Sequence, residues 1–239
     1  MDMIFGLAMV LGIGPALILM YLGVRNYTYP RVEQPFFSDP RFFMLLVVGM
    51  IAGSVLFFAL RVLGLATNVV YMVLMAIIEV MAMVVVMNLK RFRGQSDSIF
   101  YGYALGLGMS CGLSTGIVFV VASTIETIDA SVAVIVLMSV SFSLMLGAVG
   151  TTVGEGIARH RVMEFALQAA IPAIIFNILL WVLFQNPEDY GTLYYVCLVV
   201  MVAVSAYMFY RTMYQRLPQI VREVLKMEGK KRDDIPKKG

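Results

Sequence analysis

Charged residues are scarce in this sequence. Only 14% of its 239 residues are Asp, Glu, Lys or Arg, whereas 61% are hydrophobic and the mean hydropathy is +0.88. A soluble domain has about a quarter of its residues charged and about half of them apolar. So few charges cannot cover a soluble fold of this length. The composition therefore predicts an all-α, polytopic bundle of transmembrane helices.

Residues that bind metals or form disulfides are also few. The chain has one histidine, His160, and two cysteines, Cys111 and Cys197, which both lie in apolar segments. One histidine argues against a multi-histidine metal site, and the cysteines are best interpreted as small core residues. No CxxC, HExxH or P-loop pattern occurs. We therefore expect neither a metal nor a cofactor.

Seven stretches are apolar for about the 20 residues that a membrane crossing requires. They cover approximately residues 3–23, 42–60, 64–89, 98–122, 130–150, 165–184 and 191–210. The third and fourth are long, which predicts a tilt or an extension beyond the bilayer. The sequence thus predicts a seven-helix transmembrane domain over residues 1–210 and a tail over residues 211–239.

The basic residues predict the orientation of these spans. If the N-terminus lies outside, seventeen of the eighteen Lys and Arg residues fall on the inner side, and only Arg61 falls outside. Basic residues accumulate in cytoplasmic loops. We therefore expect a multi-pass membrane protein with an external N-terminus and a cytoplasmic C-terminus.

Two inner segments carry apolar side chains near the membrane surface. The first inner loop contains Phe36, Phe37, Phe42 and Phe43, which suit the bilayer interface. The tail begins with a short amphipathic pattern, in which Ile220, Val221, Val224 and Leu225 share one face, and ends in a basic segment. These features predict a helix that lies on anionic lipid, with partner docking as the alternative. We expect no nucleic-acid partner.

The fourth span is unusually rich in glycine. Small residues at i, i+4 spacing allow helix backbones to approach closely in lipid. One pair is Gly102 and Gly106, and a second row is Gly108, Gly112 and Gly116. We expect a central helix that packs tightly with spans three, five and six. On the fifth span, Ser139, Ser143 and Gly147 form a matching row of small residues. A substrate groove lined by these glycines is the alternative.

One carboxylate, Glu79, lies in the middle of the third span. Asn68 and Lys90 lie eleven residues before and after it, and at 3.6 residues per turn this spacing predicts one polar line along the helix. An ionisable residue at this depth indicates a functional site by default. The alternative is a protonated carboxyl group that fixes helix register. Asn177 in the sixth span is the natural partner of Glu79 if the two spans touch.

The segment "IIEVMAMVVVMNLKRFRGQSDSIFYGYALGLGMSCGLSTG" resembles the PrsW-type intramembrane peptidases, relatives of the CAAX-processing proteases. The resemblance extends over about residues 65–185. Glu79 falls on the second glutamate of the family's Glu-Glu pair, and Asn177 in "AIIFNILLW" falls on the asparagine of its HxxxN motif. The residues that match around the glycine helix are Asp97, Tyr101, Gly102, Gly106, Leu107 and Gly108.

Four positions depart from this family pattern. The first glutamate is replaced by Ile78, the lysine by Ala82, a later glutamate by Leu113 and the histidine by Ala173. The family is thought to activate water with its glutamate pair and histidines, and a single glutamate cannot do so. The resemblance therefore implies a prokaryotic, PrsW-like protein of the cell (cytoplasmic) membrane that has lost peptidase chemistry.

Three functions remain open from the sequence. The first is a non-catalytic protein that binds or regulates another membrane protein, for example through a transmembrane helix of that partner. The second is a divergent intramembrane protease in which Glu79 acts as base or proton donor and Asn177 stabilises an oxyanion. The third is a proton-coupled carrier of small solutes that uses Glu79, although the chain has no evident inverted repeat.

Overall fold

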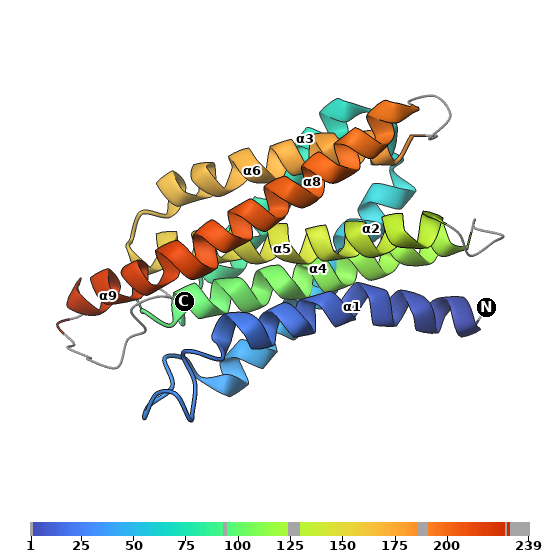
Figure 1. Ribbon diagram of the computed structural model, residues 1–239. Coiled ribbons are helices and arrows are strands. Elements are labelled where there is room, and N and C mark those ends of the chain that lie inside the picture. The colour runs from blue at the N-terminus through green and yellow to red at the C-terminus, as the bar shows by residue number, and fades with distance from the viewer. Residues whose placement is uncertain (1, 93–94, 124–129, 186–190, 228, 230–239) are drawn as a thin grey trace.

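The computed structural model describes residues 2–92, 95–123, 130–185, 191–227 and 229, and these contain helices but no strand (Figure 1). The helices in chain order are α1 Asp2–Val24, α2 Asp39–Val62, η1 Leu65–Thr67, α3 Val69–Met87, α4 Ser98–Ala122, α5 Ala130–Ala158, α6 Val162–Leu183, α8 Thr192–Tyr210, η2 Arg211–Arg216 and α9 Leu217–Met227. Within the described residues, seven helices are long and apolar enough to cross a membrane.

Two helices differ most in length from the predicted spans. The third is shorter, because Gly64 adopts a left-handed conformation and a separate 3-10 turn, η1, precedes α3. The fifth is longer and continues to Ala158 through a segment with three glycines. These glycines resemble loop residues in the sequence, but Gly150 and Gly154 lie against α4, and this close packing favours the continued helix.

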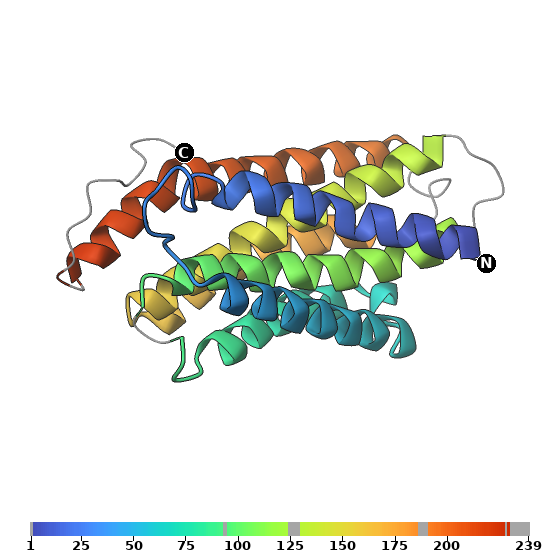
Figure 2. The same ribbon diagram turned by 90° about the horizontal axis from the view of Figure 1, so that it is seen from below.

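The long helices run alternately up and down, so that the N-terminus and the end of α9 lie at opposite ends of the bundle (Figures 1 and 2). The helix α4 is central and packs most extensively on α5, α2 and α1. Our expectation of a core of spans three to six is correct for the contacts of α4 with α5 and of α5 with α6. It is wrong for span three, because α3 packs mainly on α6 and only slightly on α4. The bundle is therefore divided into a glycine layer (α1, α2, α4 and α5) and an outer layer (α3, α6 and α8).

The glycines of α4 face two different neighbours. A methyl group added to Gly102 or Gly106 would collide with the backbone of α5, at the carbonyl oxygens of Gly150 and Leu146. One added to Gly108 or Gly112 would collide with the backbone of α2. The partner glycines on α2 are Gly49 and Gly53, and Gly116 lies against the ring of Phe57.

The small residues that we expected to match on the fifth span make other contacts. The Ser139 hydroxyl donates a hydrogen bond to the Leu11 carbonyl of α1, and Gly147 lies beside the rings and side chains of Tyr103 and Leu107. Ser143 does reach α4, where its hydroxyl lies 3.3 Å from that of Ser110. The surface of α5 that lets the α4 backbone approach is instead that of Gly150 and Gly154.

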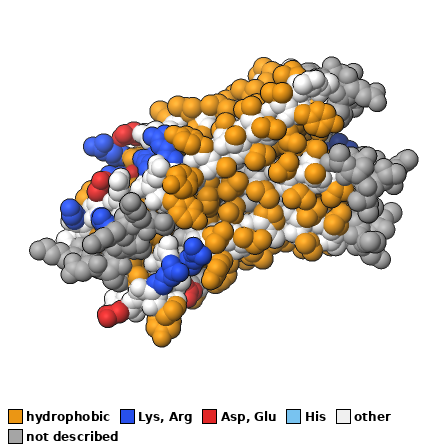
Figure 3. Space-filling model, in the orientation of Figure 1, with side chains coloured by type: hydrophobic (Ala, Val, Ile, Leu, Met, Phe, Trp, Pro, Cys, Tyr) orange, Lys and Arg blue, Asp and Glu red, His pale blue; other side chains and the backbone are white. Residues whose placement is uncertain are grey.

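Charged side chains gather at one end of the bundle, and hydrophobic side chains cover its middle (Figure 3). The ends of α1, α3, α5 and α8 and the starts of α2, α4 and α6 meet at this basic end. Exposed tyrosines mark both ends of the apolar belt: Tyr207 and Tyr210 lie near the basic end, and Tyr71 and Tyr195 near the other. Aromatic side chains of this kind are typical of membrane interfaces.

The first inner loop folds into the protein, contrary to our expectation for three of its four phenylalanines. Phe36, Phe37 and Phe42 are buried, and only Phe43 is exposed. The Phe37 ring lies 5.1 Å from that of Phe100 on α4, and Tyr27 lies 5.0 Å from the same ring. Packing in this aromatic cluster stabilises the loop more than contact with the bilayer surface would.

The amphipathic helix is present as α9, but its apolar face is covered by protein. Ile220, Val221, Val224 and Leu225 are all buried. Burial raises the pKa of Tyr27 in the first inner loop, and the charge of Arg222 on α9 lowers it, so the loop and α9 lie close together. No break separates α8 from α9, because the π-helical turn η2 connects them. The basic segment beyond α9 lies outside the described residues, apart from Gly229.

Candidate functional site

The structure brings Glu79 and Asn177 together at the contact between α3 and α6. The Asn177 side-chain Nδ2 donates a hydrogen bond to Glu79 Oε2 over 3.2 Å. Both side chains are buried, with exposed fractions of 2% and 1%. Since the α3–α6 contact was not predicted, their separation could not be known from the sequence. The chemistry of a lone carboxyl group with one deep amide was nonetheless sufficient to nominate the pair.

The amide group of Asn177 is fully engaged as a donor. Its Nδ2 also donates to the Ala173 carbonyl one turn earlier on α6, over 3.1 Å. A side-chain amide has two N–H groups, and here each has an acceptor. Asn177 therefore has no N–H group left to stabilise an oxyanion unless its bond to Glu79 breaks. The Oδ1 atom of Asn177 is buried without a hydrogen-bond partner among the described residues.

Apolar side chains enclose this pair. Met72, Met75 and Met83 are buried on the same face of α3, and Phe176 of α6 packs edge-on against Phe142 of α5 with ring centroids 5.0 Å apart. Two hollows occur elsewhere: one near Arg61 between α2, α4 and α6, and one between α6 and α8 near Arg211. Neither Glu79 nor Asn177 lines these two hollows.

The expected polar line of Asn68, Glu79 and Lys90 is not formed. Asn68 is exposed at the N-cap of α3, where its side chain accepts a hydrogen bond from the Val70 backbone N–H over 2.9 Å. Lys90 is exposed and lies beyond the C-terminus of α3. The helix is too short to carry all three residues, so Glu79 alone lies inside the bundle.

The residues that carry the family resemblance occupy several separate places. Asp97 and Tyr101 lie at the basic end of α4, where the Tyr101 hydroxyl donates to Asp97 Oδ2 over 3.3 Å and accepts from the Ser38 N–H over 3.1 Å. Of the departures, Ile78 faces outward, whereas Leu113 and Ala173 are buried. All three side chains are apolar, so none of them can offer Glu79 a further hydrogen bond.

Two overlapping G-x-S-x-G sequences in α4, Gly108–Gly112 and Gly112–Gly116, were missed among the sequence motifs. This motif forms a nucleophile elbow when its serine lies on a sharp strand-to-helix turn. Here both serines lie inside a continuous helix. Ser110 donates to the Leu107 carbonyl over 2.7 Å, and Ser114 donates to the carbonyls of Ser110 and Gly12 over 2.6 and 2.9 Å. These serines connect helices, and no histidine lies in the spans to activate them.

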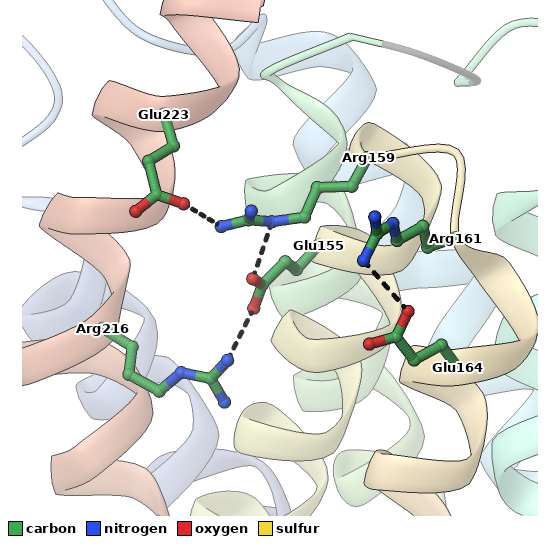
Figure 4. A network of polar contacts seen from close by, with 6 residues as sticks. All are labelled: Glu155, Arg159, Arg161, Glu164, Arg216 and Glu223. Atoms are coloured by element: carbon green, nitrogen blue, oxygen red, sulfur yellow. Dashed lines mark hydrogen bonds and ion pairs between the residues drawn. The ribbon is translucent and has the colours of Figure 1, made fainter.

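A cluster of ionic contacts at the basic end was also missed (Figure 4). The buried Glu155 carboxylate of α5 lies 2.8 Å from Arg159 and 3.5 Å from Arg216 of η2. Arg159 in turn lies 2.6 Å from Glu223 of α9. The i, i+4 spacing of Glu155 and Arg159 is a recognisable signal, but only if the segment is interpreted as helix. These contacts connect α5 to the chain after α8.

The described residues contain no group of three or more His, Cys, Asp or Glu side chains that could hold a metal ion. Comparisons with protein-family models, with curated proteins and with solved structures gave no match. Interpretation of the site therefore depends on its own chemistry. One enclosed carboxyl group with a single amide partner can fix the register of two helices. Acid–base catalysis would also require water to reach it.

Proposed function

We propose that this chain is a non-catalytic, multi-pass protein of the prokaryotic cytoplasmic membrane that binds or regulates another membrane protein. The observation that carries this proposal is the geometry of Asn177, whose two N–H groups are used by Glu79 and by the Ala173 backbone. The PrsW-like scaffold would then retain the contact between α3 and α6 but not the reaction. The resemblance in sequence supports the family and the prokaryotic setting.

The helix α3 offers a surface on which a partner's transmembrane helix can lie. It packs mainly on α6, and its outward side carries exposed apolar residues at the alternating three- and four-residue spacing of helix-packing seams. These residues are Tyr71, Leu74, Ile78, Met81 and Val85. In the resembled family this helix carries the catalytic glutamates, so a bound membrane helix would lie near the same place.

Cysteine cross-linking in native membranes tests this binding. Ile78→Cys on α3 is compared with Val199→Cys on α8, since both positions are exposed and apolar and the two native cysteines are buried. We expect one discrete adduct, identified by mass spectrometry as a membrane protein, at Ile78→Cys only. Equal adducts at both positions, or none at either, would contradict the proposal.

The orientation that we propose places the basic end in the cytoplasm, in accordance with the distribution of Lys and Arg. Arg61 and Lys90 are exposed at opposite ends of the bundle. In intact cells, a membrane-impermeant thiol reagent should label Arg61→Cys and should label Lys90→Cys only after the cells are opened. The reverse pattern would invert the proposed topology.

A divergent intramembrane protease is the second candidate, and the hydrogen bond between Glu79 and Asn177 is the observation in its favour. Proteoliposomes with a single-span peptide that carries a fluorophore and a quencher distinguish the two candidates. The non-catalytic proposal requires the same background signal from the wild type and Glu79→Gln. Cleavage that the wild type performs and Glu79→Gln does not would establish the protease.

A further inference from the structure

A crevice of about 330 Å³ lies between α6 and α8 near the basic end of the bundle. Its polar lining comes from Gln168 of α6, Thr152 of α5 and three residues of η2, Arg211, Thr212 and Arg216. Its apolar lining comes from Ile171, Pro172, Ile175, Val204 and Met208. It is separate from the enclosed pair of Glu79 and Asn177.

The polar and apolar parts of this crevice are ordered along the axis of the helix bundle. The helix α6 begins at the basic end, so Ile171 and Ile175 lie about one and two turns deeper than Gln168. The helix α8 ends there, so Met208 and Val204 lie about one and two turns deeper than Arg211. Polar groups thus line the surface end of the crevice, and hydrocarbon lines the end toward the middle of the bundle.

The surface end of the crevice has unused positive charge and hydrogen-bond donors. Within the described residues, Arg211 has no ion-pair partner and the Gln168 side chain has no hydrogen bond. Arg216 lies 3.5 Å from Glu155, which Arg159 also contacts at 2.8 Å. Arg159 also lies 2.6 Å from Glu223, so two carboxylates balance these two guanidinium groups, and the charge of Arg211 is left over. Guanidinium groups bind phosphate oxygens well, because their N–H groups form a planar fork.

The level of the crevice corresponds to a membrane surface. Exposed Tyr207 and Tyr210 lie in the last turn of α8, directly before Arg211. Tyrosine is enriched at the headgroup level of the bilayer. A ligand that reaches the crevice from the membrane would therefore present a headgroup to the arginines and an acyl chain to Val204 and Ile175.

We propose that this crevice binds a phospholipid with an anionic headgroup, through its phosphate and the first carbons of one chain. Basic pockets between transmembrane helices on the cytoplasmic side are typical sites for such headgroups. The volume accommodates this part of a lipid, and the rest of the molecule stays in the bilayer. The site is distinct from the outward face of α3, so it does not depend on the proposed protein partner.

Native mass spectrometry of the full chain, purified in detergent, tests the proposal with phosphatidylglycerol and phosphatidylcholine as probes. We expect retention of phosphatidylglycerol over phosphatidylcholine, and a loss of about fivefold in affinity for Arg211→Gln, the size of one interfacial charge. Val204→Trp should reduce retention as well, because it fills the hydrocarbon part of the crevice. The matched control is Lys226→Gln, an exposed cation at the same end that does not line the crevice.

Three results would overturn the proposal. Equal retention of the two lipids would show that the headgroup charge is not recognised. An equal loss in Lys226→Gln and Arg211→Gln would attribute binding to the basic surface as a whole. Competition by glycerol 3-phosphate, together with unchanged binding in Val204→Trp, would show a site for a soluble phosphate and not for a lipid.

Discussion

Between α4 and α5 backbone approaches backbone, whereas between α3 and α6 long side chains fill the space. Gly102 and Gly106 leave no room for a methyl group against α5. The buried face of α3 instead carries flexible methionines around Glu79: Met72, Met75, Met83 and Met87. The same membrane environment thus accommodates two kinds of interface, one rigid and one adaptable.

The two interfaces also use hydrogen bonds differently. In the glycine layer, serine hydroxyls donate to backbone carbonyls of the same or a neighbouring helix, as Ser114 does to Gly12. In the outer layer one side-chain pair, Glu79 and Asn177, connects α3 to α6. A glycine interface cannot adjust to an added atom, whereas a methionine interface can rearrange. The outer layer is therefore where a changed residue should be tolerated.

The largest expected effect is that of Gly106→Leu in the glycine layer. Overpacking costs about 1–3 kcal/mol and occasionally more, and here the added side chain meets a backbone carbonyl of α5 that cannot move aside. We expect no monodisperse protein in size-exclusion chromatography. The matched control is Gly6→Leu on α1, where an added methyl group would meet nothing within 4 Å.

Normal behaviour of Gly106→Leu would show that the glycine layer adapts as the outer layer does, and the contrast between the layers would disappear. Loss of the protein in both variants would mean that leucine is harmful for a reason other than the α4–α5 contact. The variant Gly112→Leu extends the same test to the side of α4 that packs on α2.

The sequence predicted the central position of α4 because glycines at helical spacing mark surfaces where a backbone can approach. It identified α5 as a neighbour but not α2 or α1, since a smooth surface fits any helix with small residues. From the sequence alone, Gly49 and Gly53 on α2 were as suitable for packing against α4 as the row of small residues on the fifth span. The helix pairing depends on how all seven spans fit together, and no local pattern contains that information.

At the candidate site, the pairing of Glu79 with Asn177 could be anticipated because few deep polar groups exist to satisfy a buried carboxyl group. The contacts of Glu155 could not be anticipated, because the glycines before it resemble a loop. The burial of α9 against other parts of the protein could not be predicted from the sequence either. An amphipathic pattern specifies that a face is covered, but not whether lipid or protein covers it.

The second prediction concerns Glu155, through which α5 of the glycine layer contacts the turn that continues α8. Glu155→Gln removes a carboxylate from two guanidinium groups. Breaking a fully buried pair costs about 3–5 kcal/mol, but both arginines are partly exposed, so we expect about 1–3 kcal/mol. Hydrogen–deuterium exchange should show faster exchange in η2 and α9, with α4 unaffected.

The control for Glu155→Gln is Arg161→Gln. Arg161 lies 3.5 Å from Glu164, and both side chains are largely exposed. Exposed pairs contribute about 0–1 kcal/mol, so exchange in α9 should not change in this variant. If Glu155→Gln behaved in the same way, the contacts at the basic end would not hold α8 and α9 to the glycine layer.

The smallest expected effect is the coupling between Glu79 and Asn177 in the outer layer. Interhelical hydrogen bonds in membranes contribute about 0.6 kcal/mol on average, because the separated helices also find partners. A double-mutant cycle of Glu79→Leu, Asn177→Leu and both together should therefore give a coupling energy of about 1 kcal/mol or less, measured by steric trapping in bicelles. The double variant should be at least as stable as Asn177→Leu alone, since it leaves no carboxyl group without its partner.

A much larger coupling would mean that the outer layer depends on one polar contact as strictly as the glycine layer depends on its backbone approach. The adaptable interface would then be the more specific of the two, and a site with that degree of organisation would again favour the protease.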